Sequence, residues 1–290
     1  MRNAFIQELV ALARQNPQIA LIVGDLGYSV IEPFADEFPE RFINAGVAEQ
    51  NMTGLAAGMA SEGYHVFTYS IANFPTFRCA EQIRNDVAYQ QLPVTIVSVG
   101  GGVAYGALGY SHHAVQDYAL MRTLPNMLIA APGDPMEVRA CMRYLVANPG
   151  PSYLRLGKAG EPNFHAELPD VAPGRWLRVR KGDELRVLLS TGAGMQIAME
   201  RVTHTDRAVY SMPLWSMAEK PAQCELLRNR LEVLTIEDHL QDGGFGSWLL
   251  EARAADTTLE CILHPIALSA EVCGTVGSQA TLNRLGGITD

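Results

Sequence analysis

The sequence predicts an α/β protein with two three-layer domains, each built around a mostly parallel sheet. Short apolar runs, such as residues 94–99, alternate along most of the chain with segments whose apolar residues recur at helical spacing. This alternation is interrupted at residues 161–183, where prolines, glycine and mixed charges leave no amphipathic period. With 290 residues, 48% of them hydrophobic, the chain can bury one large core or two medium ones, and two domains fit better.

The first elements are a helix, a strand and a loop. Residues 2–15 repeat apolar positions in a helical rhythm, which Asn16 and Pro17 end. Residues 19–23 form a continuous apolar run, typical of a parallel strand that is covered on both faces. The loop at the carboxyl end of this strand, residues 24–29, lies where α/β sheets bind ligands.

The rest of the first domain follows the same alternation. Residues 42–45 predict a short buried strand, and the helix after it contains many small residues, which indicates tight packing, as at an interface. Three glycines at 100–102 open a further loop. We expect strands at 65–69, 94–99, 127–130 and 152–156, and helices near 76–90, 114–123 and 135–146.

Residues 161–183 are the predicted linker between the domains. We therefore assign residues 1–160 to the first domain and residues 184–290 to a second, smaller α/β domain. Strands in the second domain are expected at 186–190, 208–210, 233–236 and 259–263, with helical segments between them.

The composition argues against several classes of protein. A formal charge of −9 and a pI near 5.3 disfavour a surface for nucleic acid or an anionic membrane, because phosphate binding needs clustered Lys and Arg. The five cysteines form no CxxC pair, which favours reduced thiols over metal ligands. No apolar run approaches 18 residues, and the N-terminus lacks a signal-peptide pattern. We expect a soluble cytoplasmic protein.

Residues 46–52 place one carboxylate, that of Glu49, in the first turn of a helix. On general grounds such a residue is a favourable dipole partner, worth about 0.3–1 kcal/mol. The run Val-Ala-Glu-Gln-Asn-Met, followed by a helix of small residues, resembles the transketolase family. The resemblance implies that Glu49 is the catalytic glutamate, which contacts and protonates the aminopyrimidine ring of thiamine diphosphate.

Two further loops resemble that family. Within residues 69–78, the resemblance implies that an aromatic side chain stacks on the aminopyrimidine. Phe74 is the first candidate and Phe77 the second, because a gapless alignment puts Pro75 at that position; both phenylalanines can also be ordinary core aromatics. The run Ser-His-His at 111–113 resembles the family's Thr-His-Gln loop, which implies that His112 hydrogen-bonds the substrate beside the thiazolium ring.

Three residues fall on family positions that grip the terminal phosphate of the substrate: Arg2, Ser29 and Arg155. Two guanidinium groups with a hydroxyl suit such an anion. As alternatives, Arg2 is a frayed terminal residue and Arg155 an ordinary ion-pair partner. The spacing from Arg2 through Asp25 to Ser29 matches the family without gaps, and the resemblance assigns Asp25 to cofactor binding.

Two departures from the family concern specificity. Leu108 stands where the family usually has an aspartate that contacts a substrate hydroxyl, and Gly100 stands where it often has a histidine. Loss of both polar groups leaves the cofactor chemistry possible but changes sugar recognition. We therefore expect an unusual or modified sugar phosphate, or a substrate with another anionic group. In the second domain we expect His239 at the surface, with an interface position as the alternative.

The resemblance covers the middle and C-terminal domains of the family, without the domain that holds the diphosphate through Mg²⁺. It implies half of a split enzyme, a pyrimidine-binding domain followed by a transketolase C-terminal domain, in an α2β2 assembly with Mg²⁺ ligands on an N-terminal partner subunit. The expected reaction moves a two-carbon ketol unit from a ketose to an aldose. The alternatives are half of a deoxyxylulose-phosphate synthase-like or 2-oxo acid dehydrogenase β-like enzyme, and a non-catalytic scaffold or regulatory paralogue.

Overall fold

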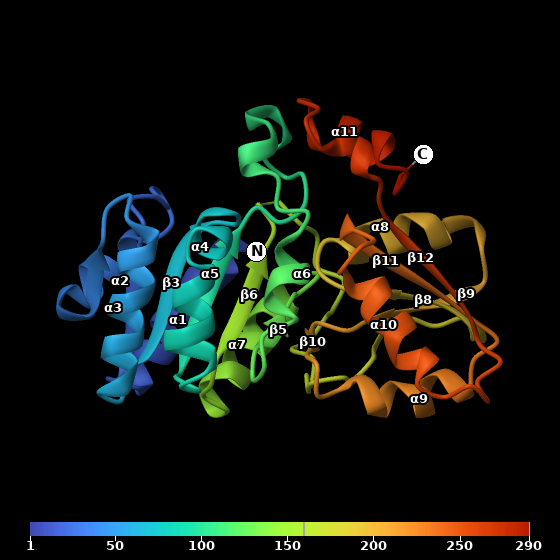
Figure 1. Ribbon diagram of the computed structural model, residues 1–290, viewed down its shortest axis with the longest axis horizontal. Helices are drawn as coiled ribbons and strands as arrows, with labels where there is room; N and C mark the ends of the chain where they lie inside the picture. Colours follow the sequence, from blue (N-terminus) through green and yellow to red (C-terminus); the bar gives the residue numbers. More distant parts are fainter. Residues whose placement is uncertain (159, 290) are drawn as a thin grey trace.

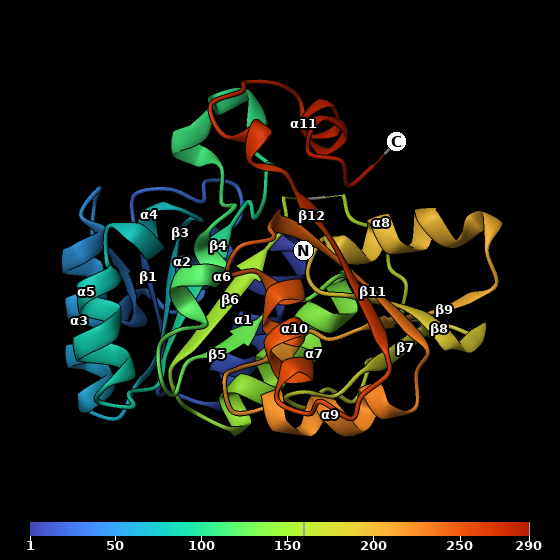
Figure 2. The same cartoon turned by 45° about the vertical axis from the view of Figure 1, so that its right-hand side comes forward.

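The computed structural model describes residues 1–158 and 160–289. The chain forms two sheets that lie side by side, each between flanking helices, and this confirms the predicted fold class (Figures 1 and 2). The first sheet has seven strands in the order β10-β5-β6-β4-β3-β1-β2, and the second has five in the order β12-β11-β8-β9-β7.

The first sheet is parallel except at β10, a strand from the second half of the chain that pairs antiparallel with β5. Its central strands are apolar and buried because helices cover both faces. The bounds are β1 (Ile19–Val23), β2 (Phe42–Asn44), β3 (His65–Ile71), β4 (Val94–Val99), β5 (Leu128–Ala130), β6 (Ser152–Leu156) and β10 (Leu214–Trp215).

Separate apolar clusters lie on the two faces of the first sheet. One face packs against α1, α2 and α7, and the other against α3, η2 and α6. The helices of this half are α1 (Arg2–Gln15), α2 (Glu32–Glu37), the 3-10 turn η1 (Pro39–Arg41), α3 (Glu49–Ser61), α4 (Phe74–Phe77), α5 (Ala80–Gln82), the π-helix η2 (Ile83–Ala88), the 3-10 turns η3 (Gly106–Leu108) and η4 (Tyr110–His112), α6 (Asp117–Met121) and α7 (Pro135–Ala147).

The second sheet is parallel except at its edge strand β7, which pairs antiparallel with β9. Its C-terminal helix α11 leaves the sheet and lies beside the loop of η3 and η4 (Figure 1). The elements are β7 (Leu177–Arg180), β8 (Asp183–Ser190), α8 (Gly194–Arg201), η5 (Val202–His204), β9 (Arg207–Ser211), α9 (Lys220–Arg228), β11 (Glu232–Leu240), α10 (Phe245–Ala254), β12 (Ile262–Leu268), η6 (Ala270–Val272) and α11 (Gln279–Leu285).

Two predicted helices differ from the structure. The helix expected at 76–90 is broken into α4, α5 and η2, because Pro75 starts a short helix and the backbone leaves helical geometry at Cys79. The helix expected at 114–123 shortens to α6, because Ala114 pairs with Gly102 in an isolated β-bridge.

Two predictions about strands also differ. The strand expected at 42–45 to be buried is β2, which lies at the sheet edge and is only partly covered. The linker expected at 161–183 contains β7, and β8 already begins at its last residue. Edge strands escape a search for continuous apolar runs, because only part of their surface is covered.

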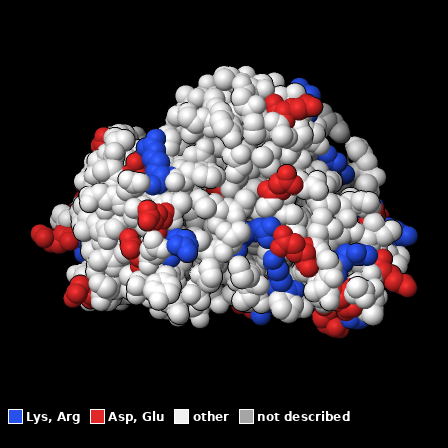
Figure 3. All heavy atoms as spheres, viewed as in Figure 1, with Lys and Arg blue, Asp and Glu red and all other residues white. Residues whose placement is uncertain are grey.

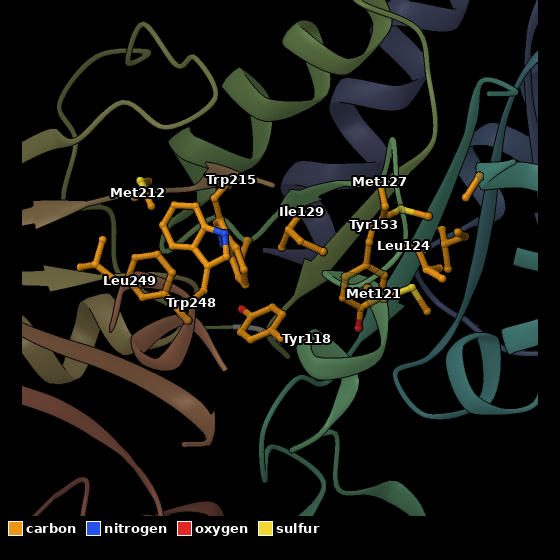
Figure 4. Close-up of a cluster of buried hydrophobic side chains, with 14 of the residues drawn as sticks. Tyr118, Met121, Leu124, Met127, Ile129, Tyr153, Met212, Trp215, Trp248 and Leu249 are labelled. Atoms are coloured by element: carbon orange, nitrogen blue, oxygen red, sulfur yellow. The ribbon is translucent and has the colours of Figure 1, made fainter. Parts of the chain in front are cut away.

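An aromatic core joins the two sheets (Figure 4). Trp215 of β10 packs against Trp248 and Phe245 of α10, with ring centroids 5.4 and 5.3 Å away. On the other side, Tyr118 of α6 meets the same indole edge-on at 5.3 Å. Because such large rings bury much apolar area, this cluster fixes the second sheet against the first.

Acidic and basic side chains are interspersed on the face shown in Figure 3. The lobe at the top of that view, formed by the loop of η3 and η4 and by α11, is largely uncharged. Among the described residues, no helix combines the length and the apolar character that crossing a bilayer requires.

Candidate functional site

The loops after β1, β3 and β4 meet at the carboxyl edge of the first sheet, where parallel sheets bind ligands. Glu49, the first residue of α3, lies there with only 3% of its surface exposed. The chain turns at Gly46 (φ +72°) before α3, so that the carboxylate enters at the positive end of the helix dipole. A Cβ on Gly24 would lie 3.7 Å from Glu49 Cγ, so Glu49 packs against the end of β1.

Arg78 connects Glu49 to an aromatic ring. Its Nη1 donates to Glu49 Oε2 at 3.0 Å, and its guanidinium carbon lies 4.0 Å from the centroid of the Phe74 ring. A cation–π contact of this kind contributes about 0.5–1 kcal/mol at an exposed site. Arg78 was not foreseen from the sequence, although its spacing of four residues from Phe74 is a signal for contact on one helical face.

His112 lies on another side of the same ring. Its imidazole meets Phe74 edge-on with a centroid distance of 5.2 Å, and its Nδ1 is 3.0 Å from Ser111 Oγ. Burial lowers the pKa of His112, and the charges of His113 and Arg78 lower it further. The imidazole is therefore neutral near pH 7 and can both donate and accept a hydrogen bond.

A cavity of about 630 Å³ opens beside these side chains. Its volume suits a ring-sized ligand. Both candidates for the stacking aromatic, Phe74 and Phe77, face this one space, and the latter is 49% exposed. The wall combines apolar surface with amide, hydroxyl and guanidinium groups, from Asn73, Phe74, Phe77, Arg78, Tyr110, Ser111, Gln116, Ala119 and Leu120.

Asn73, which precedes Phe74, is hydrogen-bonded to the segment that contains His112 and His113. Its Nδ2 donates to the carbonyl oxygen of His113 at 2.5 Å. Within the described residues, Asn73 Oδ1 and Ser70 Oγ are buried without a hydrogen-bond partner. An unpaired buried polar atom costs about 1–3 kcal/mol, so these two atoms give the site unused capacity to bind a polar ligand.

The loop after β1 carries Asp25 and Ser29, which are both exposed and both have positive φ, 54° and 65°. The backbone N–H of Asp25 donates to Asn44 Oδ1 at 3.1 Å, and Asn44 Nδ2 returns a bond to Asp25 Oδ1 at 3.0 Å. The N–H of Ser29 donates to Glu32 Oε1 at 2.7 Å. Left-handed backbone outside glycine costs about 1–3 kcal/mol and clusters at functional sites.

Arg155, expected to grip a phosphate, lies inside the protein between the two sheets and is 3% exposed. Its Nε donates to Asp117 Oδ2 at 2.7 Å, its Nη1 to Asp238 Oδ1 at 2.5 Å and its Nη2 to Ala114 O at 2.8 Å. All three nitrogens therefore have internal acceptors, and two carboxylates balance the charge. The structure corrects the phosphate assignment and supports the ion-pair alternative for Arg155.

Lys158 is the cation that lies beside Arg2. Arg2 Nε donates to the carbonyl oxygen of Lys158 at 2.8 Å, and Lys158 Nζ is 5.4 Å from the centroid of the Tyr105 ring. Burial raises the pKa of Tyr69 to about 12, and the nearby Arg2 acts in the opposite direction. Two cations and two phenols thus gather near the carboxyl ends of β3 and β6. Lys158 was missed in the sequence because it follows the apolar run of β6.

Gly100 has a packing reason for its lack of a side chain. Its φ is +83°, and a Cβ there would lie 2.1 Å from the Tyr105 ring. The phenol ring therefore fills the space that a larger residue at position 100 would need. Leu108 ends the turn η3 and is 57% exposed.

His239 is fully buried, which corrects the expected surface position. Its ring stacks on Tyr118 with a centroid distance of 5.1 Å, and its Nε2 lies 3.9 Å from Asp117 Oδ1. Burial lowers the pKa of His239. The prediction failed because β11 runs to Leu240, well beyond the expected strand at 233–236, and carries the histidine into the junction of the sheets.

Comparisons with known proteins agree with this architecture. Residues 1–160 match the family described as transketolase, pyrimidine binding domain. An apulose-4-phosphate transketolase subunit from Phocaeicola vulgatus is 33% identical over 256 residues, covering 86% of this chain and 82% of that protein. The 1-deoxy-D-xylulose-5-phosphate synthase of Clostridium perfringens is 30% identical over 259 residues, covering 86% of this chain and 41% of that protein. A solved structure described as a split gene transketolase, inactive beta4 tetramer, has a TM-score of 0.84 at 31% identity, covering 99% of this chain and 93% of that chain.

Proposed function

The chain belongs to the transketolase family, and we propose that it is the pyrimidine-binding subunit of a two-chain, thiamine-diphosphate-dependent transketolase. With its partner, it transfers a two-carbon ketol unit from an anionic ketose to an aldose. Two similarities support the two-chain organisation: one relative is named as a single subunit of a transketolase, and the similar solved structure comes from a split gene.

The arrangement around Glu49 carries this proposal. Phe74 and Arg78 line the cavity, and Arg78 also binds the carboxylate of Glu49, which is only 3% exposed. The neutral imidazole of His112 contacts the Phe74 ring. Two buried polar atoms have no hydrogen-bond partner among the described residues: Ser70 Oγ near the end of β3 and Asn73 Oδ1 at the start of α4. This combination fits a flat heteroaromatic ring that carries hydrogen-bonding nitrogens, as the aminopyrimidine of thiamine diphosphate does.

Thiamine diphosphate, when bound, supplies a carbon nucleophile for the ketol transfer. Glu49 holds and moves a proton at its carboxylate, because only a carboxyl group can do so compactly at the start of α3. Phe74 offers a stacking face, with Phe77 as the second candidate, and Asp25 contacts the cofactor from the loop after β1. His112 donates to and accepts from the oxygens of the substrate.

The anion-binding end of the substrate site consists of Arg2, Ser29 and Lys158. Lys158 replaces Arg155 in this role, because the latter has no donor nitrogen left for a ligand. A relative named for apulose-4-phosphate supports a sugar phosphate as the anionic substrate. Since Leu108 offers no polar atom at the tip of the loop, sugar recognition there is apolar.

The partner subunit supplies the diphosphate-binding domain and the ligands for Mg²⁺. Self-association through the pyrimidine-binding domain gives an α2β2 assembly. In support of this, α3 presents open space around two of its small residues, since a Cβ on Gly54 or Gly58 would meet none of the described atoms within 4 Å. All five cysteines are free thiols, which supports a reducing cytoplasmic location.

Reconstitution tests the proposal. The isolated chain is expected to show no transketolase activity and only weak Mg²⁺-dependent binding of thiamine diphosphate in calorimetry. Addition of a chain that carries the diphosphate-binding domain should restore both. Tight Mg²⁺-dependent binding by the isolated chain would contradict the two-chain assignment. A complex that binds the cofactor but transfers no ketol unit across a panel of sugar phosphates would contradict the activity.

A further inference from the structure

The C-terminal end of the chain lies against the loop that carries His112 (Figures 1 and 2). We call residues 103–113 the histidine loop and residues 276–282 the C-terminal brace. The histidine loop contains only the short turns η3 and η4, and its base is closed by the bridge between Gly102 and Ala114. Single 3-10 turns have few hydrogen bonds of their own, so the loop depends on outside contacts for a fixed geometry.

Three contacts join the brace to the loop. The N–H of Gly277 donates to the carbonyl oxygen of Gly106 at 3.3 Å. A Cβ added at Gly106 would lie 2.5 Å from Leu282 Cδ1 and 2.6 Å from Gly277 O. The backbone of the loop at Gly106 therefore packs directly against a side chain and a carbonyl group of the brace. A Cβ at Gly109 would lie 3.4 Å from Val276 Cγ2.

Two loop residues that contact the brace, Gly106 and Gly109, also bond the histidines. Gly106 O, which accepts from the brace, is also 3.3 Å from His113 Nε2, the fully buried neighbour of His112. Gly109 O accepts the N–H of His112 at 2.9 Å. A displacement of the brace therefore acts directly on Gly106 O, which contacts His113. It acts indirectly, through the packing of Val276 on Gly109, on the carbonyl group that accepts from His112.

Leu282 anchors the brace. It is fully buried in an apolar cluster with Val103 of the histidine loop and with Leu268, Val272 and Ile288 of the second half of the chain. Leu285, one turn further along α11, is 40% exposed and lies outside that cluster. Of these two leucines, Leu282 alone packs between the second half of the chain and the histidine loop.

We propose that the C-terminal brace positions His112, with Leu282 as the positioning residue, so that the second half of the chain sets the geometry of the substrate wall. The consequence for catalysis rests on the proposed function, whereas the mechanical link does not. Leu282 touches neither substrate nor cofactor and acts through Gly106 and the histidine loop.

Hydrogen exchange on the complete chain tests the link without any cofactor. Leu282→Ala is expected to speed amide exchange in residues 103–113 about tenfold or more, because the loop opens locally. Leu285→Ala is the matched control, and exchange in this loop should stay unchanged. Leu282→Met, which keeps most of the volume, should restore protection. Unchanged loop exchange in Leu282→Ala, with the variant folded by its melting temperature, overturns the proposal.

A second variant covers the case in which Leu282→Ala fails to fold. Gly106→Ala inserts a methyl group between loop and brace at a position without positive φ, so its steric effect is local. It should likewise loosen residues 103–113. Normal protection of the loop in this variant would overturn the brace.

Kinetics of the reconstituted complex separate the link from the function. Leu282→Ala should lower kcat about ten- to hundredfold through misplacement of His112, while the affinity for thiamine diphosphate stays within about twofold. Equal losses of cofactor affinity and kcat would overturn a role specific to His112. A loosened loop in a complex whose wild type has no activity would support the brace and overturn the proposed function instead.

Discussion

Two arginine–carboxylate pairs in this molecule have different surroundings. Arg78 binds Glu49 at the rim of a cavity, and its side chain is 47% exposed. Arg155 binds Asp117 and Asp238 at the junction of the two sheets, where all three side chains are at most 3% exposed. The first arginine faces an open space, and the second has only protein around it.

The comparison shows that the two arginines differ in the number of donors they have free, although they are the same residue type. Tyr153 and the backbone of Asp238 complete the internal network around Arg155, and Tyr118 lies under its guanidinium at 4.4 Å. At the rim, Arg78 makes one bond to a carboxylate and covers one ring. Arg155, whose nitrogens all have internal acceptors, stabilises the fold, although Asp117 Oδ1 and Asp238 Oδ2 have no hydrogen-bond partner among the described residues. Arg78, in contrast, keeps donors that face the cavity.

The largest effect is expected for Glu49→Gln in the reconstituted complex. Glutamine keeps the shape and can still accept from Arg78, but it cannot deliver a proton, so exchange of the reactive carbon-bound proton of the cofactor should slow about 10²- to 10⁴-fold. Assembly with the partner should be retained. NMR of proton exchange measures the rate, and Asn51→Ala, an exposed change on the same helix, is the control. Wild-type exchange in Glu49→Gln would remove Glu49 from the mechanism.

The free energy of unfolding should change most in the other region, at Arg155 in the buried junction of the two sheets. Arg155→Met leaves Asp117 and Asp238 buried without their cation, which should lower the free energy of unfolding by about 3–5 kcal/mol. Arg78→Met removes an arginine that is 47% exposed and leaves one buried carboxylate, that of Glu49, without its partner, so it should cost less than Arg155→Met, about 1–3 kcal/mol. Urea unfolding of both variants measures the difference. Equal costs for the two substitutions would refute the contrast between an open and a closed site.

The fold is easier to predict from the sequence than the details of the site. Buried parallel strands such as β1 and β4 were predictable because both faces are covered, so nearly every residue in them is apolar. The edge strand β7 and the two-residue strand β10 were not, since they have no periodicity long enough to detect. The π-helix η2 cannot be told from an ordinary helix in the sequence, because both share an apolar rhythm at this length.

Within the site, local motifs indicated Glu49, Phe74 and His112. In the structure Arg78 binds Glu49 and covers the Phe74 ring, and His112 meets that ring edge-on. The phosphate assignment of Arg155 is wrong because a position near the end of a strand does not tell whether the side chain meets solvent or another sheet. That depends on β11 and Asp238, which is 83 residues away in the chain. Contacts at such separation leave no local sequence signal.

The next prediction concerns Lys158, an exposed cation beside Arg2. Lys158→Ala removes a charge-assisted contact worth about 1.5–3 kcal/mol, so kcat/KM for anionic sugars should fall about ten- to hundredfold. Neutral sugars should be affected little. Steady-state rates across phosphorylated and non-phosphorylated ketoses measure this, with Lys181→Ala, an exposed lysine of the second half, as the control. Equal losses for neutral and anionic sugars would contradict an anion-binding role for Lys158.

The last prediction concerns pH and the buried junction of the two sheets. Glu237, next to Asp238, is fully buried and accepts the N–H groups of Phe245 and Gly246 at 2.7 Å each. Burial raises its pKa to about 8. The folded state therefore holds a proton that the unfolded state releases above its ordinary pKa of about 4.5. The stabilisation is complete below that value and is lost as pH rises towards about 8.

Glu237→Gln should remove this dependence, because the amide does not titrate. Between about pH 5 and 8, the free energy of unfolding of the wild type relative to Glu237→Gln should fall with rising pH, by at most about 1.4 kcal/mol per pH unit for one proton. Urea unfolding at a series of pH values measures the difference, and Glu260→Gln, at an exposed position, is the control. A difference that stays flat across this pH range would mean that Glu237 is ionised in the folded protein. In that case the N–H groups of Phe245 and Gly246 and the charge of Arg155, which lower the pKa of Glu237, would outweigh burial, which raises it. The junction of the sheets would then carry one more negative charge.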